Sequence, residues 1–263
     1  MVGPMSMSGA RGLGVAQGFG VDVGGSGIKG SIVDFGAGTL AVERIRIPTP
    51  QPATPKAVAE VVAELVGRFG WAGPVGVTLP CVIKGGVAKT AANVDPGWID
   101  TDAASLLSRS LGDRQVVVLN DADAAGIAEM RYGAGHDRLG VVLLLTFGTG
   151  IGSALFADGI LVPNTELGHL EVAGGDAEDL AAASVKDNEH LAWKAWAHRV
   201  TTYLRAVEEV LWPDLIIAGG GVSKKADRWL PLLNVRTPVV AATLRNDAGI
   251  VGAAMAAAQG VQP

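Results

Sequence analysis

Four stretches of the chain hold residues suited to chemistry on phosphates and hydroxyl groups: DVGGSGIK at 22–29, ND at 120–121, ELGH at 166–169 and GGG at 219–221. Asp22 follows an apolar run, so we expect it at the end of a strand beside a glycine-rich turn, whose backbone N–H groups can approach phosphate oxygens. A carboxylate there can hold Mg²⁺ through water, because Mg²⁺ prefers few carboxylates together with phosphate oxygens. The alternative interpretation is that the glycines only shape a hairpin.

Asp121 is the candidate general base. Phosphoryl transfer to an alcohol needs a carboxylate within hydrogen-bond reach of the attacking hydroxyl. Asn120, beside it, could orient the acceptor. Both residues follow an apolar run at 115–119 and precede a helical pattern at 122–131. An ordinary helix N-cap is therefore the competing interpretation.

Glu166 and His169 lie three residues apart, so they face the same way on a helical turn. A carboxylate and an imidazole can bind vicinal hydroxyls, since one accepts hydrogen bonds and the other can accept or donate. The alternative is a surface turn that happens to contain a histidine. Zinc is disfavoured at this position because no cysteine stands nearby.

Two further glycine-rich stretches are candidate phosphate turns. Gly148, Thr149 and Gly150 begin one of them, and a strand pattern rather than a helix follows, which excludes a dinucleotide-binding fingerprint. The glycines at 219–221 end an apolar strand and could direct backbone N–H groups at phosphate. They could equally serve close packing.

The elements that position these residues form two similar series. The first series comprises strands at 18–23, 28–35, 40–47, 74–79 and 115–119, with helices at 55–69 and 101–111, the latter capped by Thr101. The second comprises strands at 141–146, 153–156, 160–162 and 214–218, with helices at 189–211 and 247–258. Trp193 and Trp196 fall on the apolar stripe of the helix at 189–211, so we expect them in the core, with a ligand-binding platform as the alternative. The repetition predicts a duplicated α/β architecture with a boundary near Asp121.

Composition narrows the class of protein. The 263 residues are 49% hydrophobic, enough for one large domain or two lobes. Cys81 is the only cysteine, which excludes an internal disulfide and favours a reducing compartment, the cytoplasm. No apolar run is long and continuous enough to predict an export signal or a membrane anchor. The net charge of −5 disfavours a nucleic-acid binder, although a local basic groove could hold an anionic polymer.

With these motifs, the chain resembles the ROK family of sugar kinases over nearly all of residues 18–258, and within it most of all the branch that uses inorganic polyphosphate. The resemblance also rests on PTPQPATP at 48–55, AANV at 91–94, NDADAA at 120–125, TFGTGIG at 146–152, PNTELGH at 163–169, GGGVS at 219–223 and NDAGIVG at 246–252. It implies an actin-like ATPase, ribonuclease H-like α/β fold: two lobes with a duplicated mixed-sheet core and an interlobe cleft. The implied divisions are a flexible tail at 1–17, a small lobe at 18–120 plus 246–263, and a large lobe at 121–245. A homodimer is implied as well.

The resemblance also implies roles for individual residues. Asp121 is the expected base toward the glucose 6-hydroxyl, and Asp22 is expected near Mg²⁺. The residues expected to hold sugar hydroxyls are Asn93, Asn120, Glu166, His169 and Glu178. Those expected along the phosphate donor are Gly24, Gly25, Ser26, Lys29, Gly148, Thr149, Gly150, Gly219, Gly220 and Gly221.

Three positions depart from the family pattern. The cluster of zinc-binding cysteines that often follows the equivalent of His169 is missing here, so no zinc is predicted. Cys81 follows Pro80 where glycine is common, which could alter closure of the sugar loop or leave a reactive thiol. Ser26 replaces the usual threonine and keeps the hydroxyl.

The implied activity is phosphorylation of D-glucose at its 6-hydroxyl, with inorganic polyphosphate and also ATP as donors. An ATP-only ROK hexose kinase, such as a glucokinase or mannokinase, is the first alternative. A sugar-responsive ROK regulator is the second, and the short tail leaves no room for a helix-turn-helix domain. A polymeric donor needs additional cations, for which the candidates, each otherwise a solvated surface charge, are Lys84, Lys89, Lys186, Lys224, Lys225 and Arg228.

Overall fold

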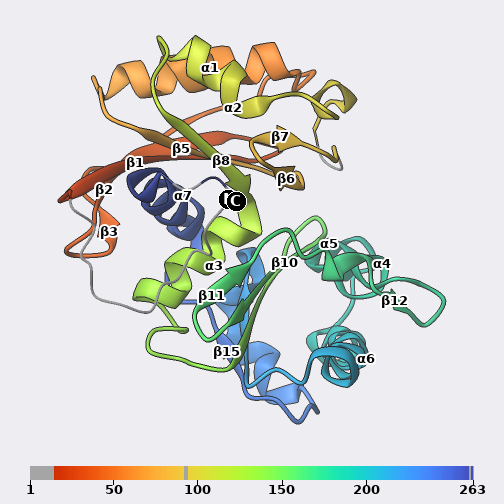
Figure 1. Ribbon diagram of the computed structural model, residues 1–263. Coiled ribbons are helices and arrows are strands. Elements are labelled where there is room, and N and C mark those ends of the chain that lie inside the picture. The colour runs from red at the N-terminus through yellow and green to blue at the C-terminus, as the bar shows by residue number, and fades with distance from the viewer. Residues whose placement is uncertain (1–14, 92–93, 261, 263) are drawn as a thin grey trace. The chain divides into compact units, whose positions relative to one another are not determined.

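The computed structural model describes residues 15–91, 94–260 and 262 and divides the chain into two compact units (Figure 1). Unit 1 comprises the described residues up to Ala128 and from Asp247 onward, and unit 2 comprises Glu129–Asn246. Each unit is built around one mixed sheet.

The sheet of unit 1 has the order β3-β2-β1-β5-β8, and β4 pairs with β2 at its side. The strands are β1 (Gln17–Val23), β2 (Ile28–Asp34), β3 (Thr39–Leu40), β4 (Ile45–Ile47), β5 (Val75–Leu79) and β8 (Val116–Asn120). β1 and β2 form an antiparallel hairpin, whereas β1, β5 and β8 run parallel. The carboxyl ends of these three strands therefore meet at one edge, which is where open α/β sheets place ligands.

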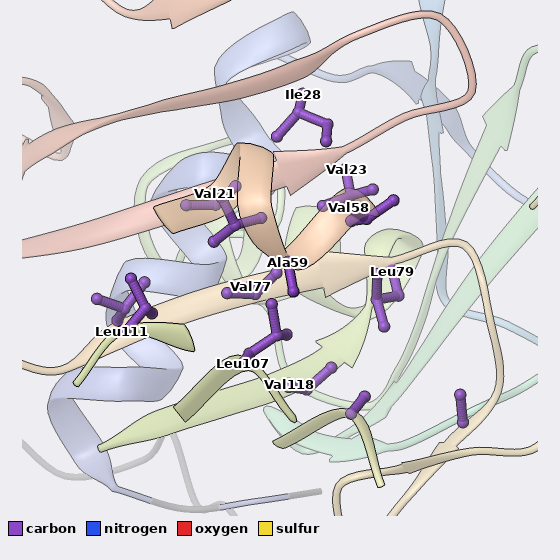
Figure 2. Close-up of a cluster of buried hydrophobic side chains, with 14 of the residues drawn as sticks. Val21, Val23, Ile28, Val58, Ala59, Val77, Leu79, Leu107, Leu111 and Val118 are labelled. Atoms are coloured by element: carbon purple, nitrogen blue, oxygen red, sulfur yellow. The ribbon is translucent and has the colours of Figure 1, made fainter. Parts of the chain in front are cut away.

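Helices cover both faces of this sheet. Helices α1 (Pro55–Arg68) and α2 (Ala103–Ser110) lie on one face and α7 (Ala248–Gln259) lies on the other (Figure 1). Figure 2 shows apolar side chains of α1, α2 and the strands, among them Val58, Leu107 and Val77, gathered in the core between the helices and the sheet. On the opposite face, α7 packs against glycines of the sheet, because a Cβ at Gly76 would lie 1.8 Å from the Ala253 carbonyl oxygen.

Shorter elements complete unit 1. They are β6 (Ile83–Lys84), β7 (Val87–Ala88) and the 3₁₀ turn η1 (Pro96–Trp98). Helix α3 (Asp121–Tyr132) begins directly after β8, in unit 1, and ends in unit 2.

Unit 2 repeats the strand order of unit 1. Its sheet runs β11-β10-β9-β14-β15, and the strands are β9 (Val141–Phe147), β10 (Ile151–Ala157), β11 (Ile160–Val162), β14 (Leu215–Gly219) and β15 (Val239–Ala241). In both sheets the first strand of the hairpin pairs in parallel with the next long strand. The predicted duplication of the mixed-sheet core is confirmed.

Helix α6 (Trp193–Leu211) covers one face of this sheet, and Trp196, Trp229 and Phe147 pack edge to face in the core beneath it. The prediction that the tryptophans are core residues is correct for Trp196, which is buried, but Trp193 is only half-buried. The remaining elements are η2 (Leu167–His169), β12 (Glu171–Val172), β13 (Gly175–Asp176), α4 (Ala177–Ala181), α5 (Ala183–Asn188), η3 (Gly221–Arg228), η4 (Leu230–Leu232) and η5 (Arg245–Asp247).

Three predicted elements differ in their bounds. The strand predicted at 40–47 is two strands, β3 and β4, because the exposed residues between them bend. Asp102, not Thr101, caps α2, since its carboxylate accepts the Ser105 N–H. The helix predicted from residue 189 begins at Trp193, because His190 has a φ of 52° and interrupts the helical backbone.

Among the described residues, none of the helices combines the length and the apolar character that a membrane span requires.

Candidate functional site

Asp22 lies at the end of β1, where a side chain of the neighbouring strand fixes its carboxylate. The Thr78 hydroxyl of β5 donates to Asp22 Oδ1 at 3.0 Å, and Lys29 Nζ lies 3.5 Å from Oδ2. Among the described residues, no group of three or more His, Cys, Asp or Glu side chains could hold a metal. A single oriented carboxylate fits Mg²⁺, which takes few protein ligands and completes its shell with water and phosphate oxygens.

The turn between β1 and β2 is held by side chains from β4 and the segment after it. Thr49 Oγ1 donates to the Gly24 carbonyl at 2.5 Å, the Arg46 guanidinium donates to the Ser26 carbonyl at 2.5 Å, and the Gln51 amide lies 3.5 Å from the Gly25 carbonyl. The Gly24 N–H also closes the turn on the Gly27 carbonyl. The turn therefore has a fixed shape, with Gly25 and Ser26 exposed.

Asn120 acts as the N-cap of α3, the alternative that the sequence left open. Its Oδ1 accepts the N–H groups of Ala122 at 2.8 Å and Asp123 at 3.2 Å, and its Nδ2 donates to the Cys81 carbonyl at 3.1 Å. One amide thus joins the start of the helix to the loop after β5. Cys81 is 1% exposed, so its thiol is buried and solvent does not reach it.

Asp121 is the first residue of α3 and is half-buried. Its Oδ1 accepts the Ala122 N–H at 2.9 Å. The carboxylate therefore stands at the positive end of the helix dipole, which favours a negative charge. Asn93, another residue predicted to hold sugar hydroxyls, lies outside the described residues.

In unit 2 the ELGH segment forms the 3₁₀ turn η2, and the predicted proximity of Glu166 and His169 is confirmed, with Glu166 Oε2 3.9 Å from His169 Nε2. His169 Nδ1 lies 2.8 Å from Asp176 Oδ2 on β13. This hydrogen bond is the largest cause of a raised pKa of His169, to which the nearby carboxylates of Glu178 and Glu166 add. Burial raises the pKa of Glu166.

Glu178 on α4 connects this cluster to the glycine turn after β9. Its Oε2 accepts the Ile151 N–H at 3.1 Å, and a Cβ at Gly150 would lie 2.3 Å from the same oxygen. The turn itself closes through the Gly148 N–H, which donates to the Gly150 carbonyl at 2.9 Å. Ser184 fixes the turn from outside, since its Oγ donates to the Thr149 carbonyl at 2.6 Å.

The glycines at the end of β14 and directly after it have different roles. Gly220 has a φ of 81°, and a Cβ there would lie 2.3 Å from the Phe147 carbonyl oxygen, so close packing requires this glycine. Gly221, where an added Cβ meets nothing within 4 Å, lines a pocket together with Gly148 and Thr149. The pocket has a volume of about 380 Å³ and is completed by Phe147, Ala183, Ser184, Lys186, Asp187, Trp193, Val222 and Lys225.

The predicted residues thus gather in two groups. Unit 1 carries Asp22, the glycine turn after it and the Asn120–Asp121 pair at one edge of its sheet. Unit 2 carries the Glu166, His169 and Glu178 cluster beside the second glycine turn. Sequence reasoning missed Asp176, Thr78 and Thr49, each of which orients a predicted residue. Thr78 and Thr49 gave little signal because their partners lie 56 and 25 residues away in the chain. Asp176 lies only 7 residues from His169, but the hairpin that joins them has strands of two residues, too short to show a pattern.

Comparison with known proteins supports one family. The model of the ROK family matches residues 18–190. The polyphosphate glucokinase of Mycobacterium tuberculosis (strain CDC 1551 / Oshkosh) is 61% identical over 240 residues, which is 91% of each chain.

Solved structures agree with this match. The inorganic polyphosphate/ATP-glucomannokinase of Arthrobacter sp. strain KM superposes with a TM-score of 0.89 at 52% identity, over 93% of this chain and 99% of that one. A ROK family glucokinase from Streptomyces griseus, in complex with glucose and AMPPNP, shares the fold with a TM-score of 0.78 at 22% identity, over 92% of this chain and 99% of that one.

Proposed function

The chain belongs to the ROK family, and on that premise we propose that it phosphorylates D-glucose to glucose 6-phosphate with inorganic polyphosphate as donor and ATP as a second donor. The observation that carries this proposal is the 61% identity, over 91% of both chains, to a polyphosphate glucokinase. The Arthrobacter glucomannokinase, with its two donors, supports the dual specificity.

In this reaction Asp121 accepts the proton of the glucose 6-hydroxyl as the oxygen attacks the terminal phosphorus of the donor. The bond from that phosphorus to the bridging oxygen breaks, and the shortened polyphosphate, or ADP, leaves with the bridging oxygen. Its place at the start of α3 sets the side chain at the positive end of the helix dipole, which favours the carboxylate form that can act as a base. Asn120 positions Asp121 by capping the same helix. Phosphoryl transfer requires little else from the protein than positioning and charge stabilisation.

The sugar is oriented by hydroxyl-binding groups. We assign this role to Glu166, His169, Glu178, Asn93 and Asn120. The hydrogen bond from His169 to Asp176 fixes the imidazole and leaves Nε2 for a sugar hydroxyl. Carboxylate and imidazole together hold vicinal hydroxyls by accepting and donating at adjacent positions.

We assign donor-phosphate binding to the residues of the glycine turns, namely Gly24, Gly25, Ser26, Lys29, Gly148, Thr149, Gly150, Gly219, Gly220 and Gly221. Asp22 would hold Mg²⁺, oriented by the Thr78 hydroxyl. Bound there, Mg²⁺ neutralises the charge of the donor phosphates. Lys29, which lies 3.5 Å from Asp22, adds a positive charge beside the same phosphates.

We further propose that the two units serve as the small and large lobes predicted from the sequence and that the enzyme works as a homodimer in the cytoplasm. The single cysteine of the chain is consistent with a reducing compartment. Light scattering coupled to gel filtration tests the dimer: a mass near 26.8 kDa, that of one chain, would contradict it.

The deciding experiment measures the initial rate of glucose 6-phosphate formation with Mg²⁺ and glucose, comparing nucleotide-free polyphosphate with ATP at saturating donor. Turnover with the polymer supports the proposal. Turnover with ATP alone would make the chain an ATP-dependent hexose kinase, and turnover with neither donor would contradict kinase function on glucose.

A further inference from the structure

The pocket beside the second glycine turn carries two cations on an aromatic ring. Lys186 Nζ lies 4.4 Å from the centroid of the Trp193 ring, and Lys225 Nζ lies 6.0 Å from it. The three residues come from α5, α6 and η3. They line the same pocket as Gly148, Thr149 and Gly221. In the proposed function, this pocket is the space into which a donor extends beyond the phosphate-binding turns.

An exposed indole face beside a phosphate-binding turn would suit a nucleoside base, because flat bases stack on aromatic side chains. Here an ammonium group competes for that ring. A cation within about 6 Å of an indole centroid is attracted by the ring electrons. The Lys186 side chain is only 16% exposed, which means that protein atoms surround most of it. A base could stack on this ring only after displacing the lysine.

Charge in the pocket favours a phosphate chain. Lys186 also pairs with Asp187, with Nζ 3.2 Å from Oδ1, but the Asp187 side chain is 76% exposed and its charge is well screened by water. Two lysines against one aspartate leave the lining positive. A polyphosphate carries charge on every unit and can meet both ammonium groups, whereas a nucleotide presents an uncharged base at the distal end of its phosphates.

We propose that Lys186, held on Trp193 and supported by Lys225, is a specificity determinant that makes this pocket bind the distal phosphates of a polyphosphate chain in preference to a nucleoside base. This inference rests on the proposed function, since it assumes that the glycine turns of unit 2 bind the donor. It adds which residues discriminate between the two donors and the reason they do so.

The test compares kcat/KM for medium-length polyphosphate and for ATP in Lys186→Met, Lys225→Met and Lys186→Arg. Methionine keeps the apolar stem that packs on Trp193 and removes the charge. We expect Lys186→Met to lower kcat/KM for polyphosphate by about tenfold, the effect of losing one charge-assisted hydrogen bond. The value for ATP should stay within about twofold or rise, because the indole becomes free to stack on adenine. Lys186→Arg should restore the preference for the polymer.

Lys194 provides a matched control. It is an exposed lysine next to Trp193 in the chain, but it does not belong to the pocket lining. Lys194→Met should leave both donors unchanged. Lys225→Met should also lower kcat/KM for polyphosphate, as Lys186→Met does. Because Lys225 is exposed, this variant tests the inference even if the more buried Lys186→Met folds poorly. Equal thermal unfolding midpoints confirm that the variants are folded.

The outcomes separate the inference from the function. If wild type uses polyphosphate but Lys186→Met and Lys225→Met reduce both donors equally, the lysines bind phosphates that both donors share and the inference is wrong, while the proposed function stands. Unchanged polyphosphate kinetics in both variants would also overturn it. If wild type neither turns over nor binds polyphosphate in calorimetry, the proposed function and the inference fail together.

Discussion

At the scale of single residues, the imidazole of His169 links the sugar-binding cluster to pH. The Asp176 carboxylate accepts a hydrogen bond from the Nδ1–H group of His169, and this hydrogen bond raises the pKa of His169. In the protonated form Nε2 can donate to a hydroxyl, while in the neutral form with Nδ1 protonated it can only accept. We therefore expect glucose affinity to fall as pH rises through the raised pKa of His169.

Asp176→Asn tests this dependence. The variant removes the negative charge, so the pKa of His169 should move down toward its ordinary value of about 6.5, and the fall in glucose affinity should move to lower pH with it. NMR titration of the imidazole and the pH profile of the glucose KM measure the two shifts. Asp137→Asn is the control, because Asp137 makes a similar contact, 3.0 Å from Nδ1 of the exposed His136. A pH profile that does not move would exclude His169 as the titrating group.

The same pair contributes to stability with a definite sign. Because the pKa of His169 is raised in the folded state, its ion pair stabilises the fold fully below the ordinary histidine pKa of about 6.5. This contribution is lost as pH rises through the raised value. Both side chains are about half exposed, so solvent screening keeps it small.

Asp121→Asn probes the proposed base. The amide keeps the size of the side chain and can still accept the Ala122 N–H, but it cannot take a proton from the sugar. We expect kcat to fall by about 10²–10⁴-fold with both donors, the range for loss of a general base, while glucose binding in calorimetry is retained. Asp113→Asn, at an exposed position in the same unit, should leave kcat unchanged. Comparable activity in Asp121→Asn would remove it as the base.

At the scale of elements, the segment after β4 shapes the first phosphate turn. Thr49 is buried, and its hydroxyl holds the Gly24 carbonyl at 2.5 Å. In Thr49→Val that carbonyl loses its partner, so the turn should loosen and the KM for either donor should rise by about five- to tenfold, as expected for one lost buried hydrogen bond. The KM for glucose should stay constant.

Thr101→Val is the matched control for that experiment. The Thr101 hydroxyl also donates to a glycine carbonyl, that of Gly97, at 2.7 Å, but it lies outside the phosphate turn. Its donor KM should equal that of wild type. An increase in KM for glucose as well as donor in Thr49→Val would indicate a general folding effect rather than a defect in the turn.

The packing of α7 on the sheet of unit 1 requires glycine on the strands. A Cβ at Gly76 would lie 1.8 Å from the Ala253 carbonyl oxygen, so Gly76→Ala must push the helix away from the sheet. We expect the free energy of unfolding to drop by about 3 kcal/mol. Gly67→Ala on α1, where the added Cβ meets nothing within 4 Å, should instead stabilise by about 0.5–1 kcal/mol, because alanine is the better helix former. Equal effects in chemical denaturation would contradict this packing argument.

The elements that could be predicted from the sequence are those fixed by local pattern. The apolar runs that became β5 and β8 are buried as strands, and the glycine turns lie directly after β1 and β9. What could not be predicted depends on how elements pair and pack, which leaves no periodic pattern in the sequence. Asp176 reaches His169 only because β12 and β13 form a short hairpin. Similarly, the helical pattern predicts Trp193 as a core residue. The contacts of Lys186 and Lys225 with its ring depend on where α5 and η3 lie in the fold, which the pattern does not give.

At the scale of the whole molecule, two electrostatic effects on a polyanionic donor oppose each other. The net charge of −5 repels it at long range, whereas the lysines of the unit 2 pocket attract it at contact. At 0.1 M salt the Debye length is about 10 Å, so the diffuse repulsion is largely screened and the contacts dominate.

We therefore expect kcat/KM for polyphosphate to fall with rising KCl at fixed free Mg²⁺. Two lysine–phosphate contacts predict a fall of about tenfold between 50 and 200 mM, because each contact displaces counterions condensed on the polymer. The fall for ATP should be shallower, and Lys186→Met should reduce the logarithmic salt slope for the polymer by roughly one. A rate with polyphosphate that rises with salt would mean that the net negative charge governs the encounter and that the contacts of Lys186 and Lys225 are secondary, since screening can accelerate only a repulsive association.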